Sequence, residues 1–373
     1  MERTEQSTNT GPKKAVIVGV EFREPPTRDD GSFAELPLLI ESLGLEVAGD
    51  IYARPHRPNL RTLVGEQIIS DIKYLAGTTG ATTVVFNDEL KGRQRNNLED
   101  ELQVEVVDRA EVILQIFADR AKTREGKIQV ELAQLLYSLP RLRGHGGQEL
   151  SALGGGIGTR GPGETKLETD ARAIRDRIAA LRGKIRQLSI TRGTQRKQRM
   201  SGKSAQWSLI GYTNSGKTTL LNALTGAEGY ADDRLFATLD PLTRKGFNPV
   251  TRKQFLVTDT VGFIQRLPTQ LVAAFQATLE EVKYADYHML IVDASDDDWQ
   301  RKLDVVHQTL DDIGVRDIPH IVAYNKIDKL EYLPLTHTPM EVFVSALKKQ
   351  GFDELHKRMA ELEEAYPIKR EIR

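Results

Sequence analysis

Apolar and polar positions alternate between two periods in the first hundred residues. Short apolar runs rich in β-branched residues, typical of buried parallel strands, are separated by longer segments with helical spacing. The predicted strands contain AVIVGV, EVAGDIYAR, ATTVVFND and VEVVD, in that order. The predicted helices between them contain FAELPLLIESLG, GEQIISDIKYLAG and NNLEDELQ. This alternation predicts an α/β domain with a parallel sheet over residues 13–107, after a disordered tail over residues 1–12.

The middle of the chain, residues 108–203, loses the strand pattern and is predicted to be helical. Asp108 and Glu111 are spaced as in a capping box, and they predict the start of a long helix that is weakened only at Gly126. A glycine-dense segment over residues 143–164 follows, and then a second helix with a heptad seam. The seam consists of Leu167, Ile174, Ile178, Leu181, Ile185 and Leu188. We predict an antiparallel helical pair that projects from the body, with the glycine-dense segment as its tip and a basic linker at its end.

Strand and helix patterns alternate again over residues 204–373. The predicted strands contain QWSLIG, KQFLVTDT, YHMLIVDAS, HIVAYNK and EVFVSA, and helical segments separate most of them. The pattern predicts a second, doubly wound α/β unit. The fold class is therefore α/β, with an N-terminal parallel-sheet domain, a helical pair and a doubly wound domain.

A phosphate-binding motif opens the second α/β unit. GYTNSGKT, residues 211–218, matches G-x-x-x-x-G-K-[ST] and lies between a predicted strand and a predicted helix. Gly211 and Gly216 allow the backbone N–H groups to surround phosphate oxygens, and Lys217 places a cation at the β- and γ-phosphates. The Thr218 hydroxyl suits Mg²⁺. The doubly wound domain is thus predicted to be a P-loop nucleotide hydrolase.

Three further motifs follow in the order that such a domain requires. DTVG (259–262) ends a predicted strand, so that Asp259 suits the Mg²⁺ shell through water and the Gly262 N–H suits the γ-phosphate. NKID (325–328) supplies the Asp328 carboxylate, which can accept two N–H donors from guanine but finds no such pair on adenine. SAL (345–347) is expected to offer backbone N–H groups to the base. Together these motifs predict a GTPase.

One threonine between the P-loop and DTVG should complete the Mg²⁺ shell in the triphosphate state. Thr238 and Thr243 compete for this role, and the FATLDP context favours Thr238. Lys217 and Gly262 are the candidate catalytic residues, and Thr218, Thr238 and Asp259 are the candidate metal site. The predicted nucleotide-binding residues are Gly211, Tyr212, Thr213, Asn214, Ser215, Gly216, Lys217, Thr218, Thr219, Phe236, Ala237, Thr238, Asp259, Gly262, Asn325, Lys326, Asp328, Ser345, Ala346 and Leu347.

Composition narrows the remaining possibilities. The 373 residues include no cysteine, which excludes disulfides, thiolate metal sites and cysteine catalysis and fits a cytoplasmic protein. No run of about 18 apolar residues predicts a membrane span, and the polar N-terminus lacks the apolar core of a signal peptide. The 7 histidines show no metal-ligand spacing, so Mg²⁺ is the only metal expected.

The formal net charge of −1 hides a local excess of basic residues. Residues 182–203 hold eight Lys/Arg and no Asp/Glu, and the glycine-dense tip carries Arg143 and Arg160. Such a run is often only a solvated helix face. Its position beside a projecting helical pair favours contact with RNA phosphates, and such contacts weaken steeply with salt.

Several segments resemble the translation-factor-related GTPases and, more narrowly, the HflX family. They are TREGKIQVELAQLLYSLPRLRG, GGGIGTRGPGETKLETDARAIRDRI, GYTNSGKTTLLNAL, LFATLDPLTR and DTVGFIQRLPTQLVAAFQATLEEV. The resemblance covers most of the chain from about Lys13. It implies an N-terminal α/β unit, a helical pair and a GTPase domain that bind GTP and GDP. It also implies GTP-dependent binding of a monomer to the large ribosomal subunit, with splitting or rescue of stalled ribosomes.

Two departures from the family pattern are visible. RPNLRTLVGEQIISDIK lacks the IGKGK-like stretch usual there, so basic contacts from that loop are not expected. The chain ends at Arg373, soon after the last predicted helix, which predicts that the C-terminal extension of some members is absent or vestigial.

Phe263 follows Gly262, where related enzymes often place a polar residue that helps water attack. A phenylalanine can neither orient nor deprotonate water, although the resemblance implies an apolar residue here. A supplied catalytic group is worth about 10³- to 10⁵-fold in rate, so we expect slow hydrolysis that a ribosome accelerates. Gln265 is nearby in sequence but is assigned no role, and simple packing of Phe263 against the core is the alternative.

The same sequence motifs allow other functions. A GTPase that acts in ribosome assembly would differ only in the particle it binds. An RNA-binding module with broad NTPase activity is disfavoured by the complete motif set. A second nucleotide in the N-terminal domain is disfavoured because VIVGVEF lacks a glycine-rich phosphate fingerprint.

Overall fold

The structure is a computed structural model of the whole chain. It describes residues 13–25, 27, 30–142, 162–200, 204–227, 235–236, 238–268, 271, 281–333 and 338–368. The predicted tail and most of the glycine-dense tip, including Arg143 and Arg160, lie outside these residues. By internal contacts the chain divides into two compact units. The first comprises Met1–Ile116 and Tyr137–Arg175, and the second comprises Phe117–Leu136 and Asp176–Arg373.

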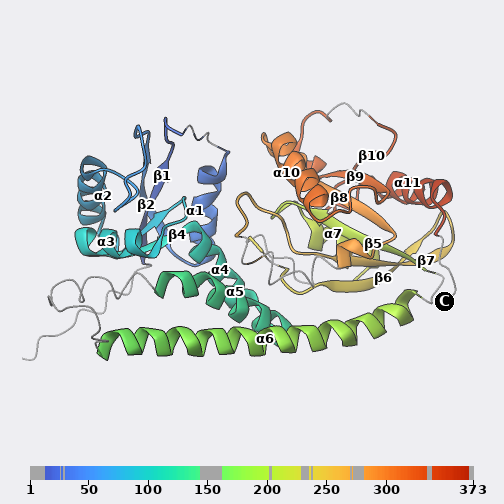
Figure 1. Cartoon of the computed structure of the whole chain (residues 1–373). Coiled ribbons are helices and arrows are strands. Elements are labelled where there is room, and N and C mark those ends of the chain that lie inside the picture. Colours follow the sequence, from blue (N-terminus) through green and yellow to red (C-terminus); the bar gives the residue numbers. More distant parts are fainter. Residues whose placement is uncertain are drawn as a thin grey trace, which may run out of the picture. The chain divides into compact units, whose positions relative to one another are not determined.

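A 4-stranded, wholly parallel sheet in the order β2-β1-β3-β4 forms the centre of the first unit (Figure 1). Its elements are β1 (Lys14–Val20), α1 (Ser32–Ser42), β2 (Glu46–Ala53), α2 (Glu66–Thr79), β3 (Thr83–Phe86), α3 (Gly92–Leu102) and β4 (Glu105–Asp108). Strands β1 and β3 are almost wholly buried because helices cover both faces of the sheet. The predicted N-terminal α/β fold is confirmed.

The core of this sheet lies mainly under α2 and α3. Apolar side chains of β1, β3 and β4 pack there against Ile69, Ile72 and Leu98. The helix α1 packs against β1 and β2 and buries Leu36, Leu39 and Ile40. Helices on both faces follow from right-handed crossovers between parallel strands.

The long helix predicted from Asp108 is two helices, α4 (Arg109–Arg120) and α5 (Arg124–Leu142). Asp108 caps the first, because its Oδ1 accepts the Glu111 N–H at 3.0 Å. Thr123 caps the second, because its Oγ1 accepts the Gly126 N–H at 2.9 Å. The interruption therefore lies at residues 121–123, just before Gly126, which is in the first turn of α5.

The second long helix, α6 (Pro162–Met200), is drawn as one continuous helix in Figure 1. Of the predicted seam, Ile178 and Leu181 are buried and Ile174, Ile185 and Leu188 are partly buried, whereas the side chain of Leu167 lies outside the described residues. Ala171, which the prediction did not include, is also buried, and most other described side chains of the helix are exposed. A bidentate ion pair, Arg177 Nε to Glu131 Oε1 at 2.6 Å and Arg177 Nη2 to Glu131 Oε2 at 3.0 Å, joins α6 to α5. The antiparallel orientation of the pair and its boundaries at 108 and 203 stay predictions.

The second unit contains a 6-stranded sheet in the order β10-β9-β8-β5-β7-β6. Five strands are parallel, and β6 pairs antiparallel with β7. Its elements are β5 (Ala205–Gly211), α7 (Lys217–Thr225), β6 (Leu242–Asn248), β7 (Lys253–Asp259), β8 (Tyr287–Asp293), α10 (Trp299–Asp312), β9 (His320–Asn325), the 3₁₀ helix η1 (Ile327–Lys329), β10 (Glu341–Phe343) and α11 (Phe352–Ala365). The strand β6 was not predicted, because LTRKGFN is polar and lies at the sheet edge.

Helices cover both faces of this sheet, as the doubly wound pattern predicts. On one face, α7 and α11 bury Leu220, Leu221 and Leu355 against the strands. On the other, α10 brings Trp299 and Leu303 against Val292 and Tyr324 of the sheet. Among the described residues, no helix has the length and apolar character needed to cross a membrane.

Candidate functional site

Four loops of the second unit meet at one edge of its sheet. The segments 211–218, 259–262, 325–328 and 345–347 follow the carboxyl ends of β5, β7, β9 and β10. These strands are parallel, so their carboxyl ends share an edge, which is where doubly wound sheets bind ligands. Motifs separated by more than 130 positions in the chain are thereby brought together.

The P-loop is fixed by backbone geometry that only glycine adopts easily. Gly216 has φ of 91°, and a Cβ there would lie 2.2 Å from Asn325 Nδ2. The helix α7 begins at Lys217, so its unpaired N–H groups face the loop. Lys217 is buried, and its Nζ donates to the carbonyl oxygens of Gly211 at 3.1 Å and Tyr212 at 2.7 Å. Burial lowers the pKa of Lys217 to about 8.

Three oxygen atoms converge beside this lysine. Thr218 Oγ1 lies 2.8 Å from Thr238 Oγ1 and 2.7 Å from Asp259 Oδ2, and Thr238 Oγ1 lies 2.8 Å from the same carboxylate oxygen. Asp259 is buried, and its other oxygen, Oδ1, has no hydrogen-bond partner among the described residues. Burial raises the pKa of Asp259, against the opposing effect of Lys217 and the two hydroxyl groups. This hard-oxygen donor set, with one orphaned carboxylate oxygen, fits Mg²⁺.

Asn325, Asp328 and Ser345 lie at the other end of the site, where the sequence motifs predict the base. Asn325 ties two loops together, because its Nδ2 donates to the Ser215 carbonyl at 2.9 Å and its Oδ1 accepts the Ala346 N–H at 3.0 Å. Ser345 Oγ donates to Asp328 Oδ1 at 2.6 Å, and this bond lowers the pKa of Asp328. The Asp328 carboxylate is therefore ionised and oriented.

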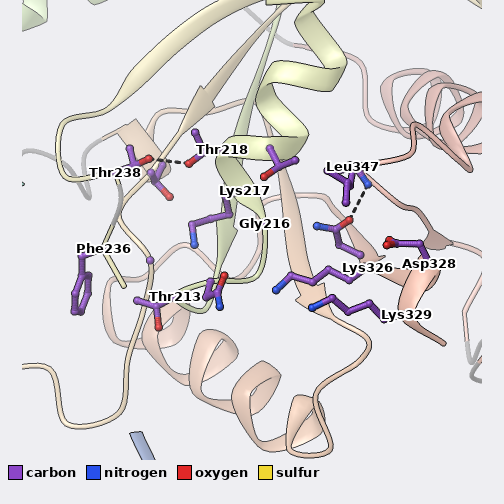
Figure 2. A pocket seen from close by; sticks show the side chains of 16 residues that line it. Thr213, Gly216, Lys217, Thr218, Phe236, Thr238, Lys326, Asp328, Lys329 and Leu347 are labelled. Atoms are coloured by element: carbon purple, nitrogen blue, oxygen red, sulfur yellow. Dashed lines mark hydrogen bonds between the residues drawn. The ribbon is translucent and has the colours of Figure 1, made fainter. Parts of the chain in front are cut away.

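A pocket of about 360 Å³ runs between these two ends. Figure 2 shows Thr238 and Phe236 at one end and Asp328 and Leu347 at the other, with Lys217 between them. The lining residues are Thr213, Asn214, Gly216, Lys217, Thr218, Thr219, Phe236, Thr238, Thr260, Gly262, Asn325, Lys326, Asp328, Lys329, Ala346 and Leu347.

Most of the predicted residues line this pocket, and the others support it. The predicted residues outside the lining are Gly211, Tyr212, Ser215, Asp259 and Ser345. Ala237 lies outside the described residues. Thr243, the competitor of Thr238, lies in β6 and pairs with Thr258 at 2.9 Å, away from the pocket.

Sequence reasoning missed Thr260 and Lys329 as lining residues. Thr260 lies inside D-x-x-G, and its hydroxyl donates to the Leu209 carbonyl of β5 at 2.6 Å, so it connects two strand ends. Lys329 directly follows NKID. The only sequence signal for these two lining residues is their position, Thr260 within D-x-x-G and Lys329 directly after N-K-x-D.

The backbone of Phe263 is hydrogen-bonded to the P-loop. Its N–H donates to the Gly211 carbonyl at 3.1 Å, and its carbonyl accepts the Thr213 N–H at 2.8 Å. The side chain is only 5% exposed and is not among the pocket-lining residues. The next turn is held too, because the Tyr212 hydroxyl accepts the Gln265 N–H at 2.7 Å. Phe263 thus packs in the core, as the alternative interpretation predicted.

Three protein-family descriptions match successive parts of the chain. Residues 30–118 match a GTP-binding GTPase N-terminal region, residues 120–199 a GTP-binding GTPase middle region, and residues 206–326 a 50S ribosome-binding GTPase. The three matches follow the order of the N-terminal sheet, the long helices and the P-loop sheet.

Curated relatives and a solved structure agree with these matches. GTPase HflX of Caldanaerobacter subterraneus subsp. tengcongensis is 48% identical over 343 residues, covering 92% of this chain and 79% of the relative. GTPase HflX of Escherichia coli K12 is 39% identical over 355 residues, covering 94% and 82%. A crystal structure of SsGBP in complex with GDP is 26% identical, covers 95% of this chain and all of that one, and has a TM-score of 0.51. Because these relatives match most of the chain and the P-loop motifs meet at one site, the chain belongs to the HflX family and is a GTP hydrolase.

Proposed function

We propose that GTP lies along the pocket with its phosphates at Lys217 and its base at Asp328. Lys217 and the N–H groups of residues 214–219 bind the β- and γ-phosphates, and the Gly262 N–H binds the γ-phosphate. Asn325 holds the base loops together while Asp328 accepts the two guanine N–H donors. Lys326, Ala346 and Leu347 line the base end.

Thr218, Thr238 and Asp259 are the residues that would hold Mg²⁺, with Asp259 acting through water. When bound, the ion neutralises charge on the β- and γ-phosphates. Thr238 reaches the ion only while its hydroxyl stays next to Thr218 and Asp259, as it does in the structure. Since the γ-phosphate and the metal together favour that arrangement, Thr238 and Gly262 distinguish GTP from GDP.

At the level of biology, the chain is a factor that binds the large ribosomal subunit in the GTP state and splits or rescues stalled ribosomes. The observation that carries this proposal is the meeting of Thr218, Thr238 and Asp259 at one point, which is the arrangement that a triphosphate-dependent switch requires. The match of residues 206–326 to a 50S ribosome-binding GTPase supports the large ribosomal subunit as the partner. The basic run over residues 182–203 supplies charge suited to RNA.

Cosedimentation with separated ribosomal subunits tests the proposal. The full chain should pellet with large subunits under a non-hydrolysable GTP analogue and remain in the supernatant under GDP. A Thr238→Ala variant should lose this difference while it still binds GDP. Equal binding under both nucleotides would contradict a GTP-dependent factor, and binding only to precursor particles would indicate a role in assembly instead.

Phosphate release tests how hydrolysis is triggered. Phe263 offers no group to orient water, so we expect slow turnover by the isolated chain and about 10³-fold or greater stimulation by large subunits. Phe263→Ala and Gln265→Ala variants separate the sources. If Gln265→Ala abolishes stimulated turnover while Phe263→Ala leaves it unchanged, the water-positioning group belongs to this chain and not to the ribosome.

A further inference from the structure

Phe236 and residues 238–240 are contacted from two sides. From the pocket side, Thr238 Oγ1 contacts Thr218 and Asp259. From the other side, its neighbours Phe236 and Asp240 contact residues at the junction of α4 and α5, more than 110 positions earlier in the chain. This junction, residues 117–126, belongs to the same compact unit as the P-loop sheet, apart from the rest of α4 and the end of α5.

The Asp240 carboxylate binds the start of α5. Its Oδ1 accepts the Thr123 hydroxyl at 2.5 Å, and its Oδ2 accepts the Thr123 N–H at 3.2 Å. The same hydroxyl oxygen accepts the Gly126 N–H, which caps the helix. An anion at a helix N-terminus is also favoured by the helix dipole. Thr123 thus performs two tasks at once, as a helix cap and as the anchor of Asp240.

Gly126 permits this close approach. A Cβ built on Gly126 would lie 2.7 Å from Asp240 Oδ1 and 3.3 Å from Thr123 Oγ1. A side chain at this position would push Asp240 away from the cap. The glycine that weakened the prediction of an unbroken helix is therefore explained by contact with the nucleotide-binding segment.

The second contact is aromatic. The rings of Phe117 and Phe236 have centroids 4.6 Å apart at an interplanar angle of 54°, and both side chains are almost fully buried. Phe236 also lines the pocket, and its φ of 56° is strained for a bulky residue. The packing against Phe117 offsets this strain and holds the Phe236 side chain in its position at the wall of the pocket.

We propose that the α4–α5 junction is a positioning element of the GTPase site: Phe117 holds Phe236 and Thr123 holds Asp240, so that Thr238 between them is presented to the metal. This inference rests on the metal-binding role proposed for Thr238. Because linkage is reciprocal, a bound triphosphate with Mg²⁺ also tightens the junction. GDP, which does not require Thr238, leaves it unchanged.

A comparison of triphosphate and diphosphate affinities tests the proposal in the full chain. Thr123→Val keeps the shape of the side chain but removes the hydroxyl that contacts Asp240. We expect it to weaken binding of a fluorescent non-hydrolysable GTP analogue at saturating Mg²⁺ by about 5- to 50-fold, with fluorescent GDP affinity unchanged. Thr123→Ser, which keeps the hydroxyl, should restore the affinity. Thr309→Val, which removes a hydroxyl bonded to the Val305 carbonyl in α10, is the matched control.

A double-mutant cycle separates this proposal from the role of Thr238. If the junction acts through Thr238, the Thr123→Val/Thr238→Ala double variant should bind the analogue no more weakly than Thr238→Ala alone. If Thr238→Ala itself has no effect, the metal-binding role fails. If Thr238→Ala weakens the analogue but Thr123→Val does not, or if Thr123→Val weakens GDP equally, the junction is only a structural contact and the positioning proposal is overturned.

Discussion

At the base end of the pocket, one carboxylate is the group we propose to read guanine. The Ser345 hydroxyl donates to Asp328 Oδ1 and lowers its pKa, so the side chain presents an ionised acceptor pair. Asn325 contributes differently, because both ends of its amide join loops of the protein. Two residues of one tetrapeptide therefore have separate tasks: Asn325 joins the loops, and Asp328 is the residue proposed to contact the base.

Replacement of Asp328 tests base recognition. Asp328→Asn places an N–H donor opposite the 2-amino group of guanine. Two donors then face each other, and neither has an acceptor. We expect GTP affinity to fall by about 5- to 150-fold, from a loss of about 1–3 kcal/mol, with xanthosine triphosphate becoming the preferred ligand. Competition binding measures this, and Glu331→Gln on the exposed surface is the control. Unchanged base preference would show that Asp328 does not contact the base.

His288 makes the stability of the second unit depend on pH. Burial, with a smaller effect of nearby His320, lowers its pKa to about 4, and its Nε2 donates to the Val282 carbonyl at 2.9 Å. A lowered histidine pKa means that the unfolded chain binds the proton more readily. The contribution of up to about 3 kcal/mol is therefore complete above pH about 6.5 and is lost as pH falls towards 4.

Urea unfolding at pH 7.5, 6 and 5 measures this contribution. His288→Gln should reduce the fall in unfolding free energy between pH 7.5 and 5, because the titrating group is gone. His56→Gln, at an exposed position in the first unit, is the matched control. An identical pH slope in wild type and His288→Gln would contradict the assignment.

At the scale of elements, α6 shows how a mostly charged helix is anchored by one apolar seam. Leu181 is fully buried, whereas Ile190 on the same helix is 69% exposed. Leu181→Ala should therefore lower the free energy of unfolding by about 2–4 kcal/mol, and Ile190→Ala by less than about 0.5 kcal/mol. Urea denaturation followed by circular dichroism compares them. Equal effects would place Leu181 outside the packed seam.

The edge strand β6 and the break between α4 and α5 are the elements whose form depends on distant partners. The polar strand β6 forms because β7 offers its backbone groups in an antiparallel ladder from Leu242–Asp259 to Asn248–Lys253. The break at residues 121–123 is stabilised because Thr123 binds Asp240 in addition to capping α5. Neither feature has a strong local signature.

At the scale of the whole molecule, net charge is uninformative because opposite charges are segregated. The net charge is −1, yet residues 182–203 hold only basic charges. If these contact ribosomal RNA, the logarithm of binding affinity should fall steeply and linearly with the logarithm of salt concentration. A binding affinity that does not change with salt concentration would contradict contacts with RNA phosphates.

Paired variants locate the responsible charges. Arg182 and Arg186 are exposed on α6, whereas Lys349 and Lys357 are exposed near and on α11. The double variant Arg182→Gln/Arg186→Gln should make the salt slope shallower by roughly 0.7–0.9 per lost phosphate contact, measured by cosedimentation with large subunits. Lys349→Gln/Lys357→Gln should leave the slope unchanged. The opposite result would place the RNA contact away from α6.

The sequence by itself determined the parallel strands of both α/β sheets, the seam of α6 and the order of the nucleotide motifs. These features depend on local periodicity and on short loops whose backbone geometry requires glycine, as at Gly216. The tertiary structure confirmed that Thr238 and not Thr243 contacts Asp259, and it alone decided that Phe263 packs in the core and that Thr123 anchors Asp240. Such choices depend on which side chains meet in space, 21 positions apart for Thr238 and Asp259 and 117 positions apart for Thr123 and Asp240, and no local sequence pattern encodes those contacts.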